Sequence, residues 1–326
     1  MKVQYKKLGW YRIKLTRKIR NLEGKELIDA LQSAIEDIHK KGYDKFGVFK
    51  HFVTQIEQEI QELKFRPKAK PREHDPFLIK RSGDGRIVLF GLSNVGKSTL
   101  MNAITNTNVK TGNYLHTTKT ALGGTCEYNQ VKIQIVDVPG FVDYRDDWMI
   151  SKQILRVART CDAILMVIDL SQNVSKQYQF LLNQLEKANL MIDGETMYKL
   201  GIIASKGDLP KSKDQFIKLE QESEYPILPI SIINEESLEK AKKFLFDMLD
   251  VIRIFTKSPN KKPDLEHPII CDYDTTVEYI SSKIHKDFLT RFHHAKVWGN
   301  SVDFDGQHVG KDHVLSDLDV VELFKT

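Results

Sequence analysis

The stretch that decides the fold is Gly91-Leu92-Ser93-Asn94-Val95-Gly96-Lys97-Ser98-Thr99, which fits the P-loop pattern G-x-x-x-x-G-K-[ST]. Residues 86–90 before it, of which 87–90 are apolar, predict a short buried strand, and residues 98–104 after it predict the start of a helix. A glycine-rich turn between a strand and a helix points several backbone N–H groups inward, and the helix N-terminus adds a partial positive charge. The stretch therefore predicts a pocket for a triphosphate.

Two side chains of this loop have distinct predicted roles. Lys97 is expected to reach the β- and γ-phosphates as a point charge, and Ser98 is expected to hold a magnesium ion through its hydroxyl. The other nucleotide contacts expected from this loop are Gly91, Ser93, Asn94, Val95, Gly96 and Thr99.

Length and composition limit the classes of protein that the chain can be. At 326 residues, more than one domain is expected. The 41% apolar and 29% charged residues are typical of a soluble globular protein, and no apolar run is long enough to cross a membrane. The first residues lack the apolar core of a secretory signal, and the three cysteines fit neither a disulfide framework nor a metal site. We therefore expect a cytoplasmic protein with reduced thiols.

Positive charge is concentrated at the N-terminus. Residues 1–20 contain eight Lys or Arg and no acid, while the whole chain has a net charge of +5, so the remainder carries −3. A second basic stretch at 64–72 contains two prolines, which oppose helix formation, and it is expected to be a linker. Such segments bind polyphosphate surfaces, so we expect a ribosome or RNA partner, without DNA sequence specificity. The alternative is a solvated tail with no partner.

Two amphipathic helices are predicted between the basic segments. Apolar residues recur at helical spacing over 27–38 and again over 49–63, and only Lys41-Gly42-Tyr43 separates the two patterns. So short a join favours an antiparallel helical hairpin. The apolar stripes are interpreted as the seam of this hairpin, with a protein-binding face as the alternative.

After the P-loop, predicted strands alternate with predicted helices. Buried apolar strands with crossover helices indicate a largely parallel sheet covered on both faces, which makes this an α/β domain. Ligands of such sheets bind at the carboxyl ends of the strands, where the P-loop lies. The predicted strands are 132–138, 163–170, 200–204 and 227–230, and the predicted helices are 149–158, 175–188, 212–222 and 237–249.

A second phosphate-contacting motif, Asp137-Val138-Pro139-Gly140, matches D-x-x-G at the end of a predicted strand. Asp137 can bind magnesium through water, and the Gly140 N–H can contact the γ-phosphate. In the preceding loop, Thr117 or Thr118 can close on magnesium and release after hydrolysis; we prefer Thr118, and a plain turn threonine is the alternative. The predicted catalytic contacts are Lys97, Thr118 and Gly140.

The base-reading motif is Ser205-Lys206-Gly207-Asp208, which resembles N-K-x-D at the end of a strand. Asp208 would accept hydrogen bonds from guanine N1 and N2, a donor pair that adenine lacks. The alkyl stem of Lys206 would cover the base. Ser231 and Ile232, after the next strand, match weakly the short loop that lies beside the guanine carbonyl.

The order of these motifs resembles that of GTPases of the translation-factor-related class, and the asparagine in Gly91–Ser98 resembles the Obg–HflX group. The C-terminal residues Ala295-Lys296-Val297-Trp298-Gly299, 309–315 and 317–321 are similar to the TGS domain of the developmentally regulated GTP-binding (DRG) proteins. The resemblance covers residues 22–326. Together with the charge and helical patterns above, it divides the chain into four parts: a basic N-terminal arm at 1–21, a helical hairpin and basic linker at 22–72, a GTP-binding domain at 73–258 and a TGS domain at 259–326.

The resemblance also implies properties that the residues alone do not. It implies a ubiquitin-like β-grasp over 266–326, association with ribosomes, GTP hydrolysis that is slow without a partner, and potassium stimulation. Asn94 matches an asparagine linked to potassium binding in related GTPases; the alternative is an asparagine that only shapes the loop.

The chain departs from the family at several positions. Ser205 replaces asparagine, and its shorter side chain is expected to lose a tie to the P-loop. The long insertion before the guanine-reading strand is missing, so that only residues 189–198 connect helix and strand, and the glycine-rich stretch after D-x-x-G is replaced by residues 141–148. Phe141 cannot orient a water as a glutamine does, and Asp143, Asp146 and Asp147 are either water-positioning groups or a solvated surface. The chain therefore looks like a shortened or divergent member.

The sequence thus predicts a GTP-hydrolysing switch that binds GTP or GDP with Mg²⁺, is stimulated by K⁺, and docks on the ribosome through its basic arm and TGS domain, with a regulatory protein partner. The first alternative is a ribosome- or RNA-binding scaffold whose nucleotide domain turns over negligibly. A weaker alternative is the use of ATP.

Overall fold

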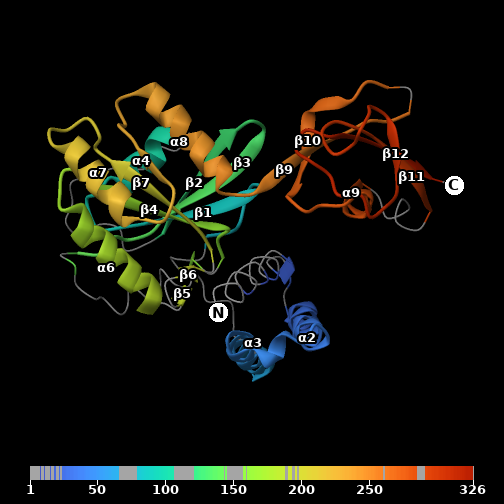
Figure 1. Cartoon of the computed structure of the whole chain (residues 1–326), viewed down its shortest axis with the longest axis horizontal. Helices are drawn as coiled ribbons and strands as arrows, with labels where there is room; N and C mark the ends of the chain where they lie inside the picture. Colours follow the sequence, from blue (N-terminus) through green and yellow to red (C-terminus); the bar gives the residue numbers. More distant parts are fainter. Residues whose placement is uncertain are drawn as a thin grey trace. The chain divides into compact units, whose positions relative to one another are not determined.

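The computed structural model of the chain divides into two compact units, residues 1–82, 86–125 and 134–241, and residues 83–85, 126–133 and 242–326 (Figure 1). The structure describes residues 8, 11, 15, 18, 19, 22, 24–65, 79–105, 121–142, 144, 157, 158, 160–187, 190–192, 195, 196, 198–259, 261–284 and 291–325.

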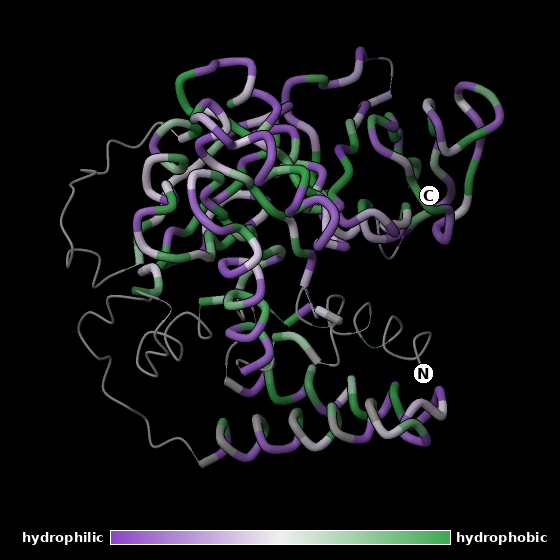
Figure 2. The backbone as a smooth tube through the Cα atoms, turned by 60° about the vertical axis from the view of Figure 1, so that its left-hand side comes forward, coloured by the Kyte–Doolittle hydropathy of each residue, from purple (hydrophilic) through white to green (hydrophobic). Residues whose placement is uncertain are grey.

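The predicted helical hairpin is present. Helix α2 (Gly24–Lys40) and helix α3 (Gly47–Phe65) are joined by Gly42, whose φ of 65° suits glycine, and by the short helix η1 (Tyr43–Lys45). Figure 2 shows hydrophobic and hydrophilic residues alternating along these helices. The predicted seam is confirmed, because one cluster buries Leu31, Ala34, Ile38, Phe49, Phe52, Val53, Ile56 and Ile60. Leu8 and Leu15 of the basic segment belong to the same cluster, so this segment shares the hairpin's core.

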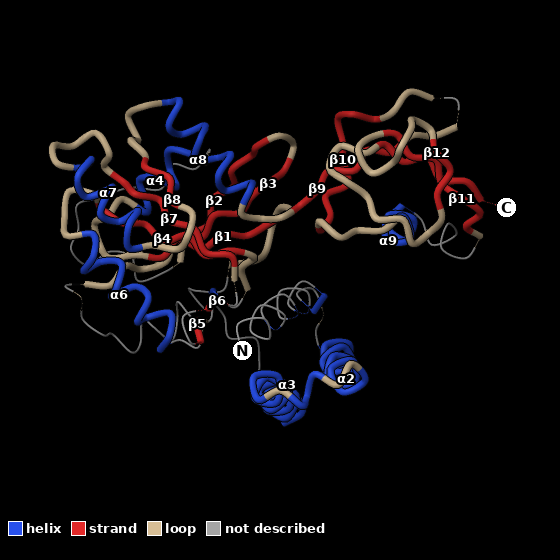
Figure 3. Tube along the Cα trace, viewed as in Figure 1, coloured by secondary structure: helices blue, strands red, loops and turns tan. Residues whose placement is uncertain are grey.

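A six-stranded sheet forms the nucleotide-binding domain (Figure 3). Its order is β2-β3-β1-β4-β7-β8, and the β1–β4, β4–β7 and β7–β8 pairs are parallel. All residues of β1 and β4 are buried, as expected for a sheet covered on both faces. The strands are β1 (Gly85–Phe90), β2 (Leu122–Tyr128), β3 (Val131–Asp137), β4 (Ala163–Asp169), β7 (Lys199–Ser205) and β8 (Ile227–Pro229), and the helices are α4 (Lys97–Ile104), α6 (Val174–Lys187), α7 (Ser212–Glu222) and α8 (Glu235–Asp247).

These elements confirm the predicted α/β fold, with two additions. Strand β2 was not predicted, because Gly123 and Gly124 interrupt its apolar pattern and alternate residues are exposed. The connection over 189–198 holds a small hairpin of β5 (Met191–Ile192) and β6 (Glu195–Thr196). Of the predicted helix 149–158, only residues 157 and 158 are described, and both are helical.

The C-terminal sheet has the order β10-β9-β13-β11-β12. The parallel β9–β13 pair lies between antiparallel pairs, and helix α9 (Val277–Ile284) follows β10, an arrangement that matches a β-grasp. Strand β9 pairs within this sheet, whereas the sequence analysis placed the domain boundary after it, at 258–259. The strands are β9 (Val251–Thr256), β10 (Asp264–Asp272), β11 (Phe292–Trp298), β12 (Gln307–Val309) and β13 (Val320–Lys325).

Among the helices in the described part of the chain, none combines the length and apolar character that a membrane span requires.

Candidate nucleotide-binding site

The P-loop lies between the end of β1 and the first residue of α4, as the motif requires. Asn94 and Gly96 have left-handed backbones, with φ of 64° and 96°, so this turn needs residues that tolerate that conformation. A Cβ at Gly91 would lie 2.7 Å from the Val167 carbonyl oxygen, so β4 also requires glycine there. The turn therefore has a local physical reason for its glycines and for Asn94.

Lys97 is buried at the start of α4, with 6% of its surface exposed. Its Nζ donates to the carbonyl of Leu92 at 2.8 Å and to that of Gly91 at 3.3 Å. Burial lowers the pKa of Lys97, and the nearby Asp137 opposes that shift. The P-loop thus holds a partly desolvated cation whose charge further anionic oxygens would stabilise.

Asp137 ends β3 and is 1% exposed. One carboxylate oxygen, Oδ2, accepts a hydrogen bond from the Ser98 hydroxyl, while the buried Oδ1 has no partner among the described residues. Burial raises the pKa of Asp137, although Lys97 and Ser98 act in the opposite direction. A buried carboxylate oxygen without a partner, next to a hydroxyl, is a donor set that fits a hard divalent cation such as Mg²⁺.

Gly140 packs directly against the P-loop. A Cβ at this position would lie 2.6 Å from each of three atoms: the Leu92 carbonyl oxygen, the Ser93 nitrogen and the Lys97 Nζ. The Ser93 hydroxyl donates to the Gly140 carbonyl at 3.0 Å, and the Ser93 N–H donates to the Phe141 carbonyl at 2.8 Å. Glycine is therefore required by the contact between the two motifs.

Phe141 is buried beside the site and points into the core. Its exposed fraction is 1%, and its ring makes edge-to-face contacts with Phe90 at 5.6 Å and Phe180 at 5.3 Å. The residue after D-x-x-G is thus an anchor for this loop. Asp143, Asp146 and Asp147 lie outside the described residues.

Ser205 ties the base-reading loop to the P-loop, contrary to the expectation from its short side chain. Its buried hydroxyl lies 2.7 Å from the Val95 carbonyl oxygen and 3.2 Å from that of Ile168. A hydroxyl has one proton to donate, and the shorter contact is the one to Val95. The predicted loss of this tie is wrong, because the close approach of β7 to the P-loop lets a serine span the gap.

The two other base-reading side chains also have partners. Asp208 accepts a hydrogen bond from the Ser231 hydroxyl at 2.8 Å, which brings the two predicted loops together. Ile232, next in the chain, is 40% exposed. Lys206 has a left-handed backbone, with φ of 60°, and its Nζ lies 2.6 Å from Asp169 Oδ2.

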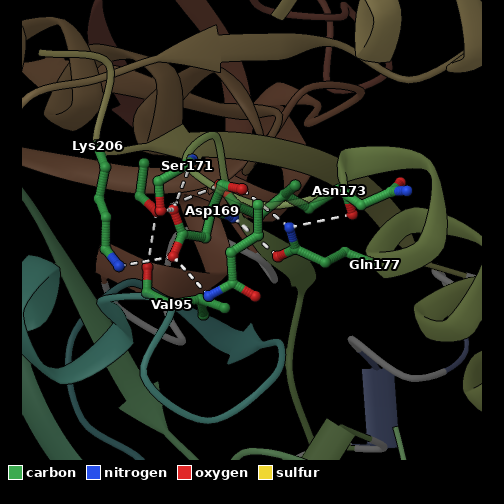
Figure 4. A network of polar contacts seen from close by, with 9 residues as sticks. Val95, Asp169, Ser171, Asn173, Gln177 and Lys206 are labelled. Carbon is green, nitrogen blue, oxygen red and sulfur yellow. Dashed lines mark hydrogen bonds and ion pairs between the residues drawn. The ribbon is translucent and has the colours of Figure 1, made fainter. Parts of the chain in front are cut away.

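Asp169 is a candidate site residue that the sequence analysis missed (Figure 4). It is 0% exposed at the end of β4 and accepts hydrogen bonds from Ser171, Gln172 and Lys206. The sequence contains a signal that could have identified this residue, because Asp169 is the only charged residue in the apolar stretch 163–170. A buried acid at the carboxyl end of a parallel strand indicates a site.

Two predicted metal contacts remain untested by the geometry. Thr118, and Thr117 beside it, lie outside the described residues. Asn94 is exposed, and its positive φ supports the interpretation that it shapes the loop. The other P-loop residues that were predicted lie in the turn, with Val95 buried and Thr99 in the first turn of α4.

Family models match both folded regions of the chain. The model described as 50S ribosome-binding GTPase matches residues 86–195, and the TGS domain model matches residues 252–325. The fold and the site therefore define a P-loop GTPase with a C-terminal TGS domain.

Proteins that are similar to this chain over most of its length indicate a narrower class of GTPase. Developmentally-regulated G-protein 3 of Arabidopsis thaliana is 29% identical, over 76% of this chain and 84% of that protein. Developmentally-regulated GTP-binding protein 1 of Xenopus laevis is 27% identical, over 86% and 92%. The chain is therefore similar, along most of its length, to the DRG proteins.

A solved GTP-binding protein from Pyrococcus horikoshii is also similar, with 14% identity, a TM-score of 0.48, and coverage of 74% of this chain and 100% of that one. The similarity to the DRG proteins rests on the sequence matches.

Proposed function

We propose that the protein binds GTP and GDP with Mg²⁺, hydrolyses GTP to GDP and phosphate, and acts as a ribosome-associated switch. This proposal rests on the part of the site that would bind the phosphates, which we call the phosphate end. There, the buried Lys97 and the Asp137 Oδ1, which has no partner among the described residues, lie at the turn that leads into α4.

At this end, each residue would act on the phosphates or on the metal. Lys97 would exchange its two carbonyl partners for β- and γ-phosphate oxygens, which stabilise its charge better. Ser98 and Asp137 would hold Mg²⁺, and Thr118 would complete its ligands. The ion would neutralise charge on the phosphate oxygens.

The switch would act through the contact between Gly140 and the P-loop. A γ-phosphate that accepts the Gly140 N–H would compete with the bonds that Ser93 makes to this segment. Phe141 limits the movement, because its ring is held between Phe90 and Phe180. A small shift would therefore stay close to Gly140 and the P-loop atoms that it approaches.

Hydrolysis is expected to be slow in the isolated protein. Phe141 points into the core, where it cannot orient a water. Catalysis would then depend on positioning and electrostatics, with K⁺ at Asn94 and a ribosomal or protein partner supplying the remainder.

Ribosome association is proposed from the N-terminal charge and from the description of the family model. The eight basic residues of 1–20 would contact RNA. Residues 266–326 contain six Lys or Arg and eleven acids, so the TGS domain would contact ribosomal protein in preference to RNA. Such a protein would act in the cytoplasm.

Nucleotide binding is tested first. Fluorescent GDP and GTP analogues should bind in the presence of Mg²⁺, unlabelled GTP should displace them, and ATP should not. Failure of either analogue to bind the wild-type protein would refute the proposal, and equal displacement by ATP would remove the guanine assignment.

Turnover separates the switch from its alternative, a scaffold that binds nucleotide without hydrolysing it. The buried Phe141 favours that alternative. GTP turnover should be measured with Na⁺ or K⁺, and with or without ribosomes. Stimulation by either addition supports the switch, whereas tight binding without turnover under all four conditions supports the scaffold.

A further inference from the structure

We propose that Asp169 is a positioning residue for guanine recognition: it fixes the Lys206 amine so that the alkyl stem of Lys206 stands ready against one face of the base. This inference rests on the proposed binding of guanine nucleotides and assigns a residue outside the nucleotide motifs to that same site.

Asp169 lies where it can act on the base-reading loop. It is the last residue of β4 and pairs in register with Ser205, the last residue of β7, so Lys206 begins directly beside it. The side chain of Asp169 is 0% exposed, while that of Lys206 is 36% exposed. A buried, immobile carboxylate therefore holds the end of a side chain whose stem reaches the surface.

The carboxylate is itself held in one orientation (Figure 4). Asp169 Oδ1 accepts from the Ser171 N–H at 2.8 Å and from the Ser171 hydroxyl at 2.6 Å, and Oδ2 accepts from Gln172 Nε2 at 3.1 Å. The Gln177 side-chain amide bonds both the N–H and the carbonyl of Asp169, at 3.0 and 2.8 Å. Three hydrogen bonds thus fix the carboxylate, and two more fix the backbone of Asp169, independently of Lys206.

Lysine needs such an anchor. Its four-carbon stem is flexible, and ordering it costs side-chain entropy. The left-handed backbone of Lys206 sets where the stem starts, and the contact with Asp169 Oδ2 at 2.6 Å sets where it ends. With both ends fixed, the stem is ordered before the base arrives, and this cost does not reduce the affinity for nucleotide.

The base would then meet two groups that are already positioned. Asp208, held by Ser231 from the β8 side, would read the edge of guanine, and Lys206, held by Asp169 from β4, would cover its face. Burying the carboxylate carries a desolvation cost that an apolar residue would avoid, and ion pairs of this kind add little net stability. We therefore assign the pair to binding.

A double-mutant cycle tests the assignment, with a fluorescent GDP analogue and Mg²⁺ as the probe. Asp169→Asn keeps the shape of the side chain and should weaken GDP binding about tenfold, since one charged contact is lost. Lys206→Met keeps an unbranched stem without the amine. In the Lys206→Met background, Asp169→Asn should change the affinity less than about twofold.

Two outcomes would overturn the proposal. If Asp169→Asn costs about tenfold in both backgrounds, Asp169 acts through the fold and not through Lys206. If Asp169→Asn leaves the wild-type affinity unchanged, Lys206 needs no anchor. Glu236→Gln is the matched control, because it removes the acid of an exposed ion pair with Lys240 on α8, away from the nucleotide motifs, so GDP affinity should be retained.

A second readout uses inosine diphosphate, which lacks the guanine N2 donor. Asp169→Asn should weaken GDP and inosine diphosphate equally, because the Lys206 stem covers either base, whereas Asp208→Asn should alter their ratio. A changed ratio in Asp169→Asn would overturn the proposal. If the wild-type protein binds no GDP analogue, the proposed function fails; if it binds but the cycle shows no coupling, only this inference fails.

Discussion

The two ends of the nucleotide site are built on different principles. At the phosphate end, charged groups are buried with bonding capacity left over: Lys97 is almost fully buried, and Asp137 Oδ1 has no partner among the described residues. At the base end, Ser205, Lys206 and Asp208 are each already bonded to another part of the domain.

This difference separates two sources of nucleotide affinity. The phosphate end would bind through charge that the protein alone leaves poorly compensated, so single changes there should have large effects. The base end would bind through prior ordering, so changes there should be smaller unless they remove the group that reads the base edge. Each prediction below tests one side of this comparison.

The largest effect is expected from Lys97→Met, which removes the charge while filling the same space. The affinity for GTP should fall at least about 100-fold, which corresponds to about 3 kcal/mol, because contacts from a charged donor to phosphate are lost. Equilibrium binding of a fluorescent GTP analogue measures it. The fold should be retained, since burial lowers the pKa of Lys97 and the charge is not favoured there. Unchanged affinity would mean that the phosphate end does not bind through charge.

Asp208→Asn should have the next largest effect, and it tests base reading. GTP affinity should fall about 100-fold, because an amide cannot accept from both guanine donors as a carboxylate does. Xanthosine triphosphate has a carbonyl in place of the guanine amino group, so the variant should bind it better than the wild type does. Ser231→Ala is the control, because it removes the partner of Asp208 and leaves the carboxylate. A variant with unaltered base preference would contradict the assignment.

Gly140→Ala should separate GTP from GDP. The added Cβ would press on the Leu92 carbonyl oxygen, the Ser93 nitrogen and Lys97 Nζ. The first two are backbone atoms, which cannot move aside cheaply. We expect GTP affinity to fall about tenfold and GDP affinity to change less than about twofold, since only GTP needs the Gly140 N–H. Equal losses for both nucleotides would show that the contact shapes the whole loop.

Asp137→Asn tests whether the phosphate end gives up stability for function. Burial raises the pKa of Asp137 above 3.8, so the folded state binds a proton more tightly than the unfolded chain does. The stability contributed by this group is therefore present below pH 3.8 and is lost as the pH rises through the raised folded value. At neutral pH without nucleotide, the variant should gain about 1 kcal/mol in free energy of unfolding.

Urea unfolding at several pH values measures this gain, which should shrink as the pH approaches 3.8. The same variant should lose the Mg²⁺ dependence of nucleotide binding. A destabilised variant at neutral pH would mean that the Ser98–Asp137 hydrogen bond outweighs the cost of burying the charge.

The phosphate end was the more predictable of the two from sequence. Gly91, Gly96 and Lys97 lie in one contiguous motif, whose spacing allows few other structures. Asp137 and Gly140 follow from the end of an apolar strand. By contrast, the partners at the base end come from separate strands, and Asp169 reaches Lys206 only because β4 and β7 are neighbours in the sheet.

The misses of the sequence analysis have the same cause. Exposed and buried residues alternate along strand β2, which also contains two glycines. Its assignment as a strand therefore depends on its pairing within the sheet. From the sequence alone, strand β9 is interpreted as the end of the GTP-binding domain. Its parallel pairing with β13 is what places it in the C-terminal sheet. The role of Ser205 depends on its distance from Val95, which spacing in the sequence does not give.

Ser205→Ala should have the smallest effect, because it removes a hydrogen bond between neutral groups and leaves the loop otherwise intact. GDP and GTP affinities should fall together by about three- to tenfold, which corresponds to about 1 kcal/mol, because the base-reading loop loses its tie to the Val95 carbonyl. Ser212→Ala is the matched control, since its hydroxyl bonds the Gly207 carbonyl of the same loop at 2.7 Å without reaching the P-loop. Competition binding measures the GDP and GTP affinities of both variants. If Ser212→Ala costs as much as Ser205→Ala, any loosening of the loop weakens binding, and the tie between the two ends of the site has no special part in it.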